Sequence, residues 1–277
     1  MARERSLIGA VLGPVLAVGL LAGCGATAAA APEPARAAGT TGPAAAAAVQ
    51  QEFVSVIQRV LPSVVEIRTN DGLGSGVVLD ADGDIVTNAH VVAGASTFQV
   101  LAATSPAPST SSAASPTSVP AVLIGSCPAD DLAVIRVSDT AGLRPATFGD
   151  AADVAVGDLV LVIGSPLGLG GSVTEGIVSA IGRSVTEPAS AGSPVAVLAG
   201  AIQTSAAINP GNSGGALVGI GGEVIGIPTL AAVNRSAGGA APGIGFAIPA
   251  SLAVSVGRQL VATRGAIPGA APSGCHH

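Results

Sequence analysis

Gly211-Asn212-Ser213-Gly214-Gly215 is the stretch that does most to narrow the fold of this chain. Small residues on both sides of Ser213 would let a carbonyl group approach the serine hydroxyl closely. The backbone amides of Gly211 and Ser213 could then stabilise negative charge on the carbonyl oxygen. Because the chain contains 39 glycines, the same letters are also compatible with a plain glycine turn.

The order of histidine and serine along the chain separates two fold classes that use such a serine. The stretch fits the G-x-S-x-G pattern of α/β-hydrolases, whose catalytic histidine follows the serine. Here only the terminal His276 and His277 follow Ser213, whereas His90, the one internal histidine, precedes it. This order disfavours an α/β-hydrolase and matches the histidine, acid, serine order of the chymotrypsin class.

An acidic residue suited to this order lies between His90 and Ser213. Asp131 opens the apolar run Asp131-Leu132-Ala133-Val134-Ile135, and a carboxylate at the mouth of a buried strand can accept the imidazole Nδ1–H. Asp130 is the neighbouring alternative, but in an extended chain its side chain would point to the opposite face. We therefore expect His90, Asp131 and Ser213 to form a catalytic triad, with Gly211 and Ser213 as the oxyanion hole.

Short β-rich runs separated by Gly, Asp and Pro fill most of the chain and predict an antiparallel sandwich or barrel. Helical spacing of apolar residues predicts short helices over residues 50–60 and from Ser251 to Arg264. The Ser/Thr/Ala/Pro stretch between Ala102 and Pro120 predicts an exposed loop. The β-rich runs are 64–68, 76–79, 85–87, 132–137, 159–163, 173–181, 195–202 and 224–227.

The composition excludes nucleic acid as the expected partner. All 11 basic residues are Arg and the net charge is -6, which leaves no basic stripe for a phosphate backbone. With four Phe and no Trp or Tyr, the chain also lacks aromatic platforms on which bases could stack.

The N-terminus has the features of an export signal. Arg3 and Arg5 precede an apolar run that ends in Leu21-Ala22-Gly23-Cys24, which resembles the lipobox of bacterial lipoproteins. An ordinary cleaved signal peptide and an uncleaved anchor that merely contains a Cys are the alternatives. We expect a lipoprotein signal peptide over 1–23, a flexible Ala/Pro-rich tether over 24–47, a folded domain over 48–265 and a tail over 266–277.

Several segments together resemble the protease domain of HtrA/Deg-type, trypsin-like serine proteases of the chymotrypsin-like class. The resemblance covers roughly residues 50–264 and implies that the folded domain is all-β, with two six-stranded antiparallel barrels and short N- and C-terminal helices. Most members of that family continue into a C-terminal PDZ domain, which is not expected here. The matching segments are 74–78, 82–92, 131–137, 157–168, 172–182, 203–217 and 243–249.

The resemblance implies a serine endopeptidase that hydrolyses envelope or secreted, misfolded polypeptides through an acyl-enzyme, without a metal or other cofactor. A chaperone-like or binding scaffold with little proteolytic activity is the alternative function. Lipidation of Cys24 would place the protein on the outer face of the cytoplasmic membrane, and secretion is expected if the lipobox is not used. The sequence does not specify the oligomeric state, and a homo-oligomer is compatible with the resemblance.

By the same resemblance, Ile208 forms the floor of the primary specificity pocket, and Ala232 and Ile244 are lesser candidates for its wall. No acidic residue aligns with this pocket. A buried Lys or Arg side chain of a substrate would therefore lack a counter-ion, which is costly. The expected preference is for small or medium aliphatic side chains.

Two positions depart from the family pattern, and a third differs from digestive zymogens, in ways that affect the expected chemistry. Ser205 stands where the family usually has Asp, so a charge near the specificity pocket is missing. Pro228 stands where the family often has Asn, in a strand that pairs with substrate, and proline has no N–H to donate. Asn212 replaces the Asp that digestive zymogens use to bind a newly cut N-terminus, so activation by that route is not expected.

The remaining cysteines suggest a disulfide in the exported domain. Once Cys24 is modified, Cys127 and Cys275 are the two thiols that remain in the chain. Because an exported domain meets an oxidising environment, we expect these two cysteines to form a bond.

Overall fold

The computed structural model describes residues 42–70, 72–95, 97–102, 118–165, 171–187, 194–234 and 239–263. The chain separates into two compact units, Met1–Thr41 and Gly42–His277, and every described residue belongs to the second. The expected signal peptide, Cys24, most of the expected 102–120 loop and Cys275 lie outside the described residues. Among the described residues, no helix has the length and hydrophobicity needed to span a membrane.

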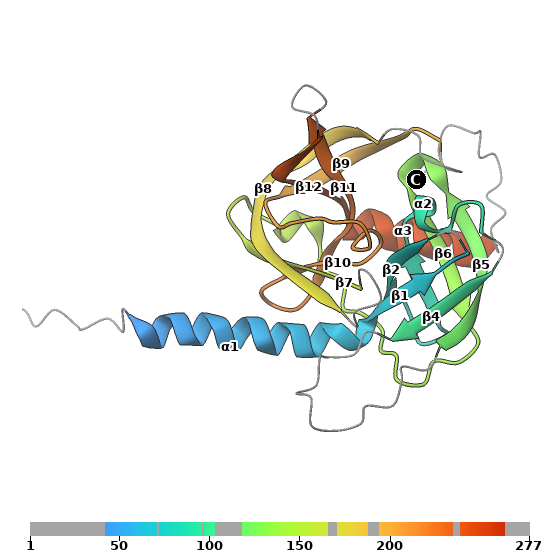
Figure 1. Ribbon diagram of the computed structural model, residues 1–277, viewed down its shortest axis with the longest axis horizontal. Helices are drawn as coiled ribbons and strands as arrows, with labels where there is room; N and C mark the ends of the chain where they lie inside the picture. Colours follow the sequence, from blue (N-terminus) through green and yellow to red (C-terminus); the bar gives the residue numbers. More distant parts are fainter. Residues whose placement is uncertain are drawn as a thin grey trace, which may run out of the picture. The chain divides into compact units, whose positions relative to one another are not determined.

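The first six strands close into an antiparallel barrel with the order β1-β2-β3-β6-β5-β4 (Figure 1). Pairing of β1 with β4 closes the sheet, and side chains such as Ile67, Ile85 and Ile135 fill its interior. The strands are β1 (Val64–Arg68), β2 (Leu73–Val78), β3 (Asp84–Thr87), β4 (Phe98–Ala102), β5 (Ser118–Cys127) and β6 (Leu132–Val137).

The last six strands close into a second antiparallel barrel with the order β10-β11-β12-β9-β8-β7. Pairing of β10 with β7 closes it, around a core that includes Val162, Ile202 and Leu217. The prediction of two six-stranded barrels is therefore confirmed. The strands are β7 (Leu159–Gly164), β8 (Ser172–Glu187), β9 (Ala196–Thr204), β10 (Ala216–Gly219), β11 (Val224–Asn234) and β12 (Gly239–Pro249).

Both predicted helices are present, but the first is longer than expected. Helix α1 spans Pro43–Val60, so it begins inside the stretch expected to be a tether. Alanines, which have the highest helix propensity, fill this region, and proline is well tolerated in the first turn of a helix. Helix α3 spans Ala250–Thr263. The described residues also form four short helical turns: η1 (Leu61–Ser63), α2 (Ala89–Val92), η2 (Pro128–Asp130) and η3 (Ala151–Asp153).

Helix α3 contacts both barrels, touching β3, β5 and β6 of the first and β11 and β12 of the second (Figure 1). Its buried side chains Val256 and Leu260 join a continuous apolar cluster with Val56 of α1 and Leu132 of β6. Because the chain has only four Phe, this core is built from aliphatic side chains that must interlock closely. The packing fixes the two barrels side by side, with His90 of α2 and the turns that carry Asp131 and Ser213 between them.

Candidate active site

His90 lies on the short helix α2, directly after strand β3. Asn88 has an extended backbone and precedes the helix, so the chain turns sharply at the end of the strand. The Asn88 side-chain amide donates a hydrogen bond to the backbone oxygen of Asp131, at 2.9 Å. This bond ties the turn that carries His90 to the turn that carries the acid.

Asp131 follows the η2 turn and has left-handed backbone angles, with φ 51° and ψ 42°. It is the one non-glycine residue with positive φ in the described part of the chain, and aspartate tolerates this conformation better than most residues. The extended backbone that we assumed around Asp130 is therefore wrong. Residues 128–130 form a helical turn, and the Asp130 carboxylate lies 3.0 Å from Cys127 Sγ instead of facing His90.

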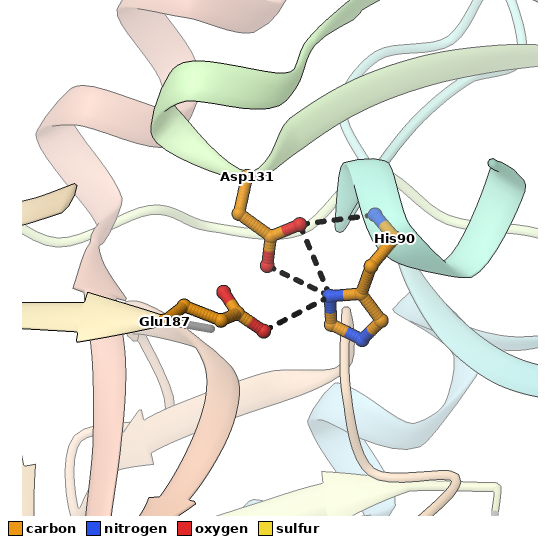
Figure 2. Close-up of side chains that lie close together, drawn as sticks. All are labelled: His90, Asp131 and Glu187. Atoms are coloured by element: carbon orange, nitrogen blue, oxygen red, sulfur yellow. Dashed lines mark hydrogen bonds and ion pairs between the residues drawn. The ribbon is translucent and has the colours of Figure 1, made fainter. Parts of the chain in front are cut away.

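The Asp131 carboxylate holds the imidazole of His90 through two donors. The ring Nδ1 lies 3.0 Å from Oδ1 and 2.9 Å from Oδ2, and the backbone N–H of His90 donates to Oδ1 at 3.0 Å (Figure 2). The Thr229 hydroxyl donates to Oδ2 at 2.6 Å. These contacts favour the tautomer with its proton on Nδ1, which leaves Nε2 free to accept one.

Ser213 lines the same cavity as His90, a hollow of about 350 Å³ that also includes Ile208, Gly211 and Thr229. Its hydroxyl donates to the backbone oxygen of Thr229 at 3.2 Å, and the described residues show no hydrogen bond between this hydroxyl and the imidazole. Catalytic hydrogen bonds are often long or misaligned until substrate binds. The structure therefore brings the three predicted residues together, with the serine hydroxyl turned toward Thr229.

The backbone around Ser213 leaves two amides available for a ligand. Gly211 has φ +100°, and neither its N–H nor that of Ser213 donates to a backbone acceptor among the described residues. The carbonyls of both residues face Ser75: the Ser75 hydroxyl donates to Gly211 O at 2.6 Å, and the Ser75 N–H donates to Ser213 O at 2.9 Å. This arrangement suits the expected oxyanion hole.

Ser75, a fully buried residue on β2, links the nucleophile loop to both barrels. Its hydroxyl accepts the N–H of Ser165 at the end of β7, at 2.8 Å, and its carbonyl accepts the Thr87 hydroxyl at 2.6 Å. Gly214 has φ +81°, and a Cβ there would collide with Ser75 O and Thr87 Oγ1. The loop backbone thus lies directly against β2, which only glycine allows at this position.

Glu187 is a site residue that the sequence did not indicate. Its carboxylate lies 3.5 Å from His90 Nδ1 through Oε1 (Figure 2). Its Oε2 lies 3.2 Å from the Thr229 hydroxyl. The residue is the last of strand β8, which extends past the expected run of 173–181. No local motif marks it, because its position depends on where β8 ends in the closed barrel.

The charges around the imidazole shift two pKa values. Burial lowers the pKa of His90, but the hydrogen bond to Asp131 and the charges of Asp131 and Glu187 outweigh it, so this pKa is raised above 6.5. Burial and the charge of Asp131 raise the pKa of Glu187 to about 7. Glu187 therefore exchanges its proton near neutral pH, and His90 keeps its proton to a higher pH than a free imidazole does.

His90, Asp131 and Glu187 also form the one group of potential metal ligands within the described ranges, with ligand atoms within 4.8 Å of one another. A metal ion on Nδ1 would displace the proton that Asp131 accepts and would force the remaining imidazole proton onto Nε2. His90 could then not act as a base. The contacts of Asp131 with His90 and Thr229 instead suit a hydrogen-bonded catalytic group.

Of the three residues predicted to form the specificity pocket, Ile208 is the one that the structure places in the lining of the cavity. Ile208 lines the cavity and is 8% exposed; a Cβ on Gly245 would lie 2.6 Å from Ile208 Cδ1, so Ile208 packs on the Gly245 backbone. Ile244 is 38% exposed and does not belong to the described lining of the cavity. The Ala232 side chain lies outside the described part of the structure.

Ser205 and Pro228, the two residues that depart from the family pattern, have structural partners. Ser205 accepts the N–H of Ile177 through its hydroxyl, at 3.0 Å. Pro228 O accepts the N–H of Gly214 at 2.9 Å, so this residue supports the nucleophile loop through its carbonyl. Asn212 is buried and uncharged, and its Oδ1 has no hydrogen-bond partner among the described residues.

The predicted disulfide is described at one end only. Cys127 is buried at the end of β5 and is disulfide-bonded. Cys275, like Cys24, lies outside the described residues, so the pairing of Cys127 with Cys275 stays a prediction.

Comparisons with known proteins agree with this geometry. A family model described as a trypsin-like peptidase domain matches residues 74–227. The solved structure of the "HtrA-type protease AlgW with tripeptide" superposes with a TM-score of 0.62 at 38% identity, covering 76% of this chain and 63% of that one.

Curated relatives match over most of the same region. "Serine protease PepD" of Mycobacterium tuberculosis is 42% identical over 216 residues, which are 75% of this chain and 46% of the relative. "Periplasmic serine endoprotease DegP" of Escherichia coli is 41% identical over 190 residues, 68% of this chain and 36% of the relative. The matched region is thus less than half the length of these relatives.

We predict that Ser75→Ala destabilises the folded domain, because it leaves the buried Gly211 O and Ser165 N–H without their partner. The free energy of unfolding should fall by about 1 to 3 kcal/mol, as measured by urea denaturation. Ser118→Ala is the matched control, since the exposed Ser118 hydroxyl bonds Gln99 alone within the described part of the chain, and its effect should stay within about 0.5 kcal/mol. Equal effects of the two variants would contradict the role assigned to Ser75.

Proposed function

This chain belongs to the family of trypsin-like peptidase domains, and from that premise we propose that it is a serine endopeptidase with His90, Asp131 and Ser213 as its triad. One observation carries the proposal: His90 is bonded to Asp131 through Nδ1 while its ring and Ser213 line one cavity. The relatives PepD and DegP are named as serine proteases, which supports the same activity.

In the proposed reaction, His90 Nε2 takes the proton of the Ser213 hydroxyl as its oxygen attacks the carbonyl carbon of a peptide bond. The N–H groups of Gly211 and Ser213 stabilise the oxyanion that forms. His90 then gives the proton to the leaving amine, and the C–N bond breaks to leave an acyl-enzyme. Water, deprotonated by the same imidazole, releases the acyl group and restores the serine.

Asp131 has an electrostatic and orienting role in this reaction. Its carboxylate keeps the Nδ1 proton in place and stabilises the imidazolium that forms when Nε2 is protonated. Since His90 must be neutral to act as a base, activity falls as the pH drops through its pKa. Because that pKa is raised, the loss of activity should begin above pH 6.5 and should reverse when the pH is restored.

We predict that Ser213→Ala, His90→Ala and the double variant are about equally inactive on casein, because residues that act as a unit are not additive. Asp131→Asn should lose about 10³- to 10⁴-fold in kcat. Asp130→Asn is the matched control and should lose far less, since the described hydrogen bonds and ion pairs of His90 go to Asp131 and Glu187. Labelling by a fluorophosphonate should map to Ser213. Cleavage of casein by Ser213→Ala at the parent rate would disprove the triad.

The primary specificity pocket is proposed to accept small or medium aliphatic side chains. Ile208 supplies apolar surface beside Ser213, and no described acidic residue lines that cavity to pair with a basic substrate side chain. Ala232 and Ile244 remain candidates for the wall.

We predict that peptide-library profiling finds a preference for Val, Ala or Ile before the cleaved bond. Ile208→Ala enlarges the cavity and should shift the preference toward Leu, Met or Phe. Leu159→Ala, which truncates an exposed aliphatic side chain outside this cavity, should leave the profile unchanged. A strong preference for Arg in the parent enzyme would refute this pocket.

The substrates are proposed to be misfolded polypeptides outside the cytoplasm. The DegP relative is named as periplasmic, and the N-terminal Arg residues and apolar run of this chain have the features of an export signal. Cys24 is proposed to carry lipid and to attach the protein to the outer face of the cytoplasmic membrane. With Cys24 acylated, Cys275 is the remaining cysteine that can pair with Cys127.

We predict that Cys24→Ala releases the protein from the membrane fraction of expressing cells, since two acyl chains on one residue give stable attachment. Mass spectrometry of the mature N-terminus should find a diacylated Cys24. Cys127→Ala is the control for loss of a cysteine and should remain membrane-bound. Full membrane retention of Cys24→Ala would exclude the lipid anchor.

A further inference from the structure

The Nδ1 edge of His90 faces two carboxylates, whereas the triad requires one. Asp131 Oδ2 lies 2.9 Å from Nδ1, and Glu187 Oε1 lies 3.5 Å from the same atom (Figure 2). Glu187 is well shielded, with 14% of its side chain exposed. Among the described residues, it forms no ion pair other than that with His90.

The single proton of the Thr229 hydroxyl limits how Asp131 and Glu187 can both form hydrogen bonds with Thr229. The Thr229 hydroxyl has one proton and lies 2.6 Å from Asp131 Oδ2 but 3.2 Å from Glu187 Oε2. If that proton goes to the closer and more deeply buried Asp131, Glu187 can bond Thr229 only by donating a proton of its own. A protonated Glu187 therefore completes a chain of donors that runs from Glu187 through Thr229 to Asp131.

Ionised Glu187 has a different effect. Its charge would lie beside Nδ1 and would favour the imidazolium, but it would also repel the Asp131 carboxylate. The titratable groups that face Glu187 are His90 from α2 and Asp131 after η2, while Thr229 of β11 contributes only its hydroxyl. His90 and Glu187 must therefore titrate as a coupled pair.

We propose that Glu187 is a positioning residue: its carboxyl group, held beside the Nδ1 edge of His90 and against the Thr229 hydroxyl, sets the basicity of His90 through its own charge. This inference rests on the proposed function for its catalytic meaning. With Glu187 neutral, His90 responds to one carboxylate and is a weaker base. With Glu187 ionised, His90 is a stronger base and its imidazolium is better stabilised. The rate at high pH is therefore higher, and the loss of activity on acidification begins at a higher pH.

The first test follows the imidazole directly, in full-length Ser213→Ala protein that cannot cleave itself. The chain has three histidines, so a His90→Ala comparison assigns the His90 Cε1–H signal in proton NMR. In the Ser213→Ala parent, this signal should shift over two pH steps. Adding Glu187→Gln should leave one step, with its midpoint lower by about one pH unit because the second charge is gone.

Two further variants control for the effect of Glu187→Gln on the His90 titration. Glu175→Gln removes the same charge from an exposed position on the same strand and should leave the His90 titration unchanged. Glu187→Asp, which withdraws the carboxylate by one methylene, should give an intermediate midpoint and provides the comparison if the Gln variant does not fold. A His90 midpoint that is the same in the parent and in every folded Glu187 variant would overturn the proposal.

The second test measures activity with Ser213 intact. The acid limb of kcat/KM should move to lower pH in Glu187→Gln, and the high-pH plateau should fall by roughly three- to tenfold, with kcat rather than KM carrying the loss. An unmoved acid limb would again overturn the role of Glu187. Absence of cleavage by the parent would disprove the proposed protease activity instead, and the NMR titration would still decide how Glu187 acts on His90.

Discussion

The buried Asp131 carboxylate is the group on which the candidate active site depends. It is 1% exposed, so it must obtain from the protein the hydrogen bonds that water would otherwise give it. Two of its donors belong to His90 of the first barrel, and the third is Thr229 on strand β11 of the second. The need to satisfy one buried charge therefore holds elements of both barrels in a fixed relation. The same contacts support the left-handed backbone at Asp131, which is unfavourable alone.

The nucleophile loop is held by a second, uncharged set of contacts. Ser75 of the first barrel bonds the carbonyls on both sides of Asn212, and Pro228 of the second barrel accepts the N–H of Gly214. These bonds fix the loop through its carbonyls and use neither the Gly211 N–H nor the Ser213 N–H, the two donors that we propose as the oxyanion hole. Such preorganised amides stabilise developing charge without having to reorient during the reaction. Pro228, although it lacks an N–H, retains the carbonyl that this arrangement uses.

The sequence predicted those parts of the site that depend on residue type and chain order. His90, Asp131 and Ser213 could be ranked because the one internal histidine, an acid and the serine of the 211–215 stretch follow one another in the chymotrypsin order. The short β-rich runs predicted eight strands but not β4, β5, β10 or β12. The prediction of an extended backbone before Asp131 was wrong, since residues 128–130 form a helical turn. The predicted first helix was shorter than α1, because the alanines before Gln50 lack the apolar periodicity on which the prediction relied. Glu187 was missed because barrel closure, which no local pattern encodes, brings β8 to His90.

The position of Glu187 shows why a second carboxylate can be tolerated beside a catalytic imidazole. Two ionised carboxylates around one neutral ring would repel each other in a partly buried space. Their environments differ, however. Asp131 accepts three hydrogen bonds, whereas Glu187 shares the Thr229 hydroxyl with Asp131, and burial is the main cause of its raised pKa. Unequal environments assign different protonation states to two similar groups. The rise of the Glu187 pKa to about 7 follows from this inequality, so the charge beside the Nδ1 edge of His90 changes near neutral pH.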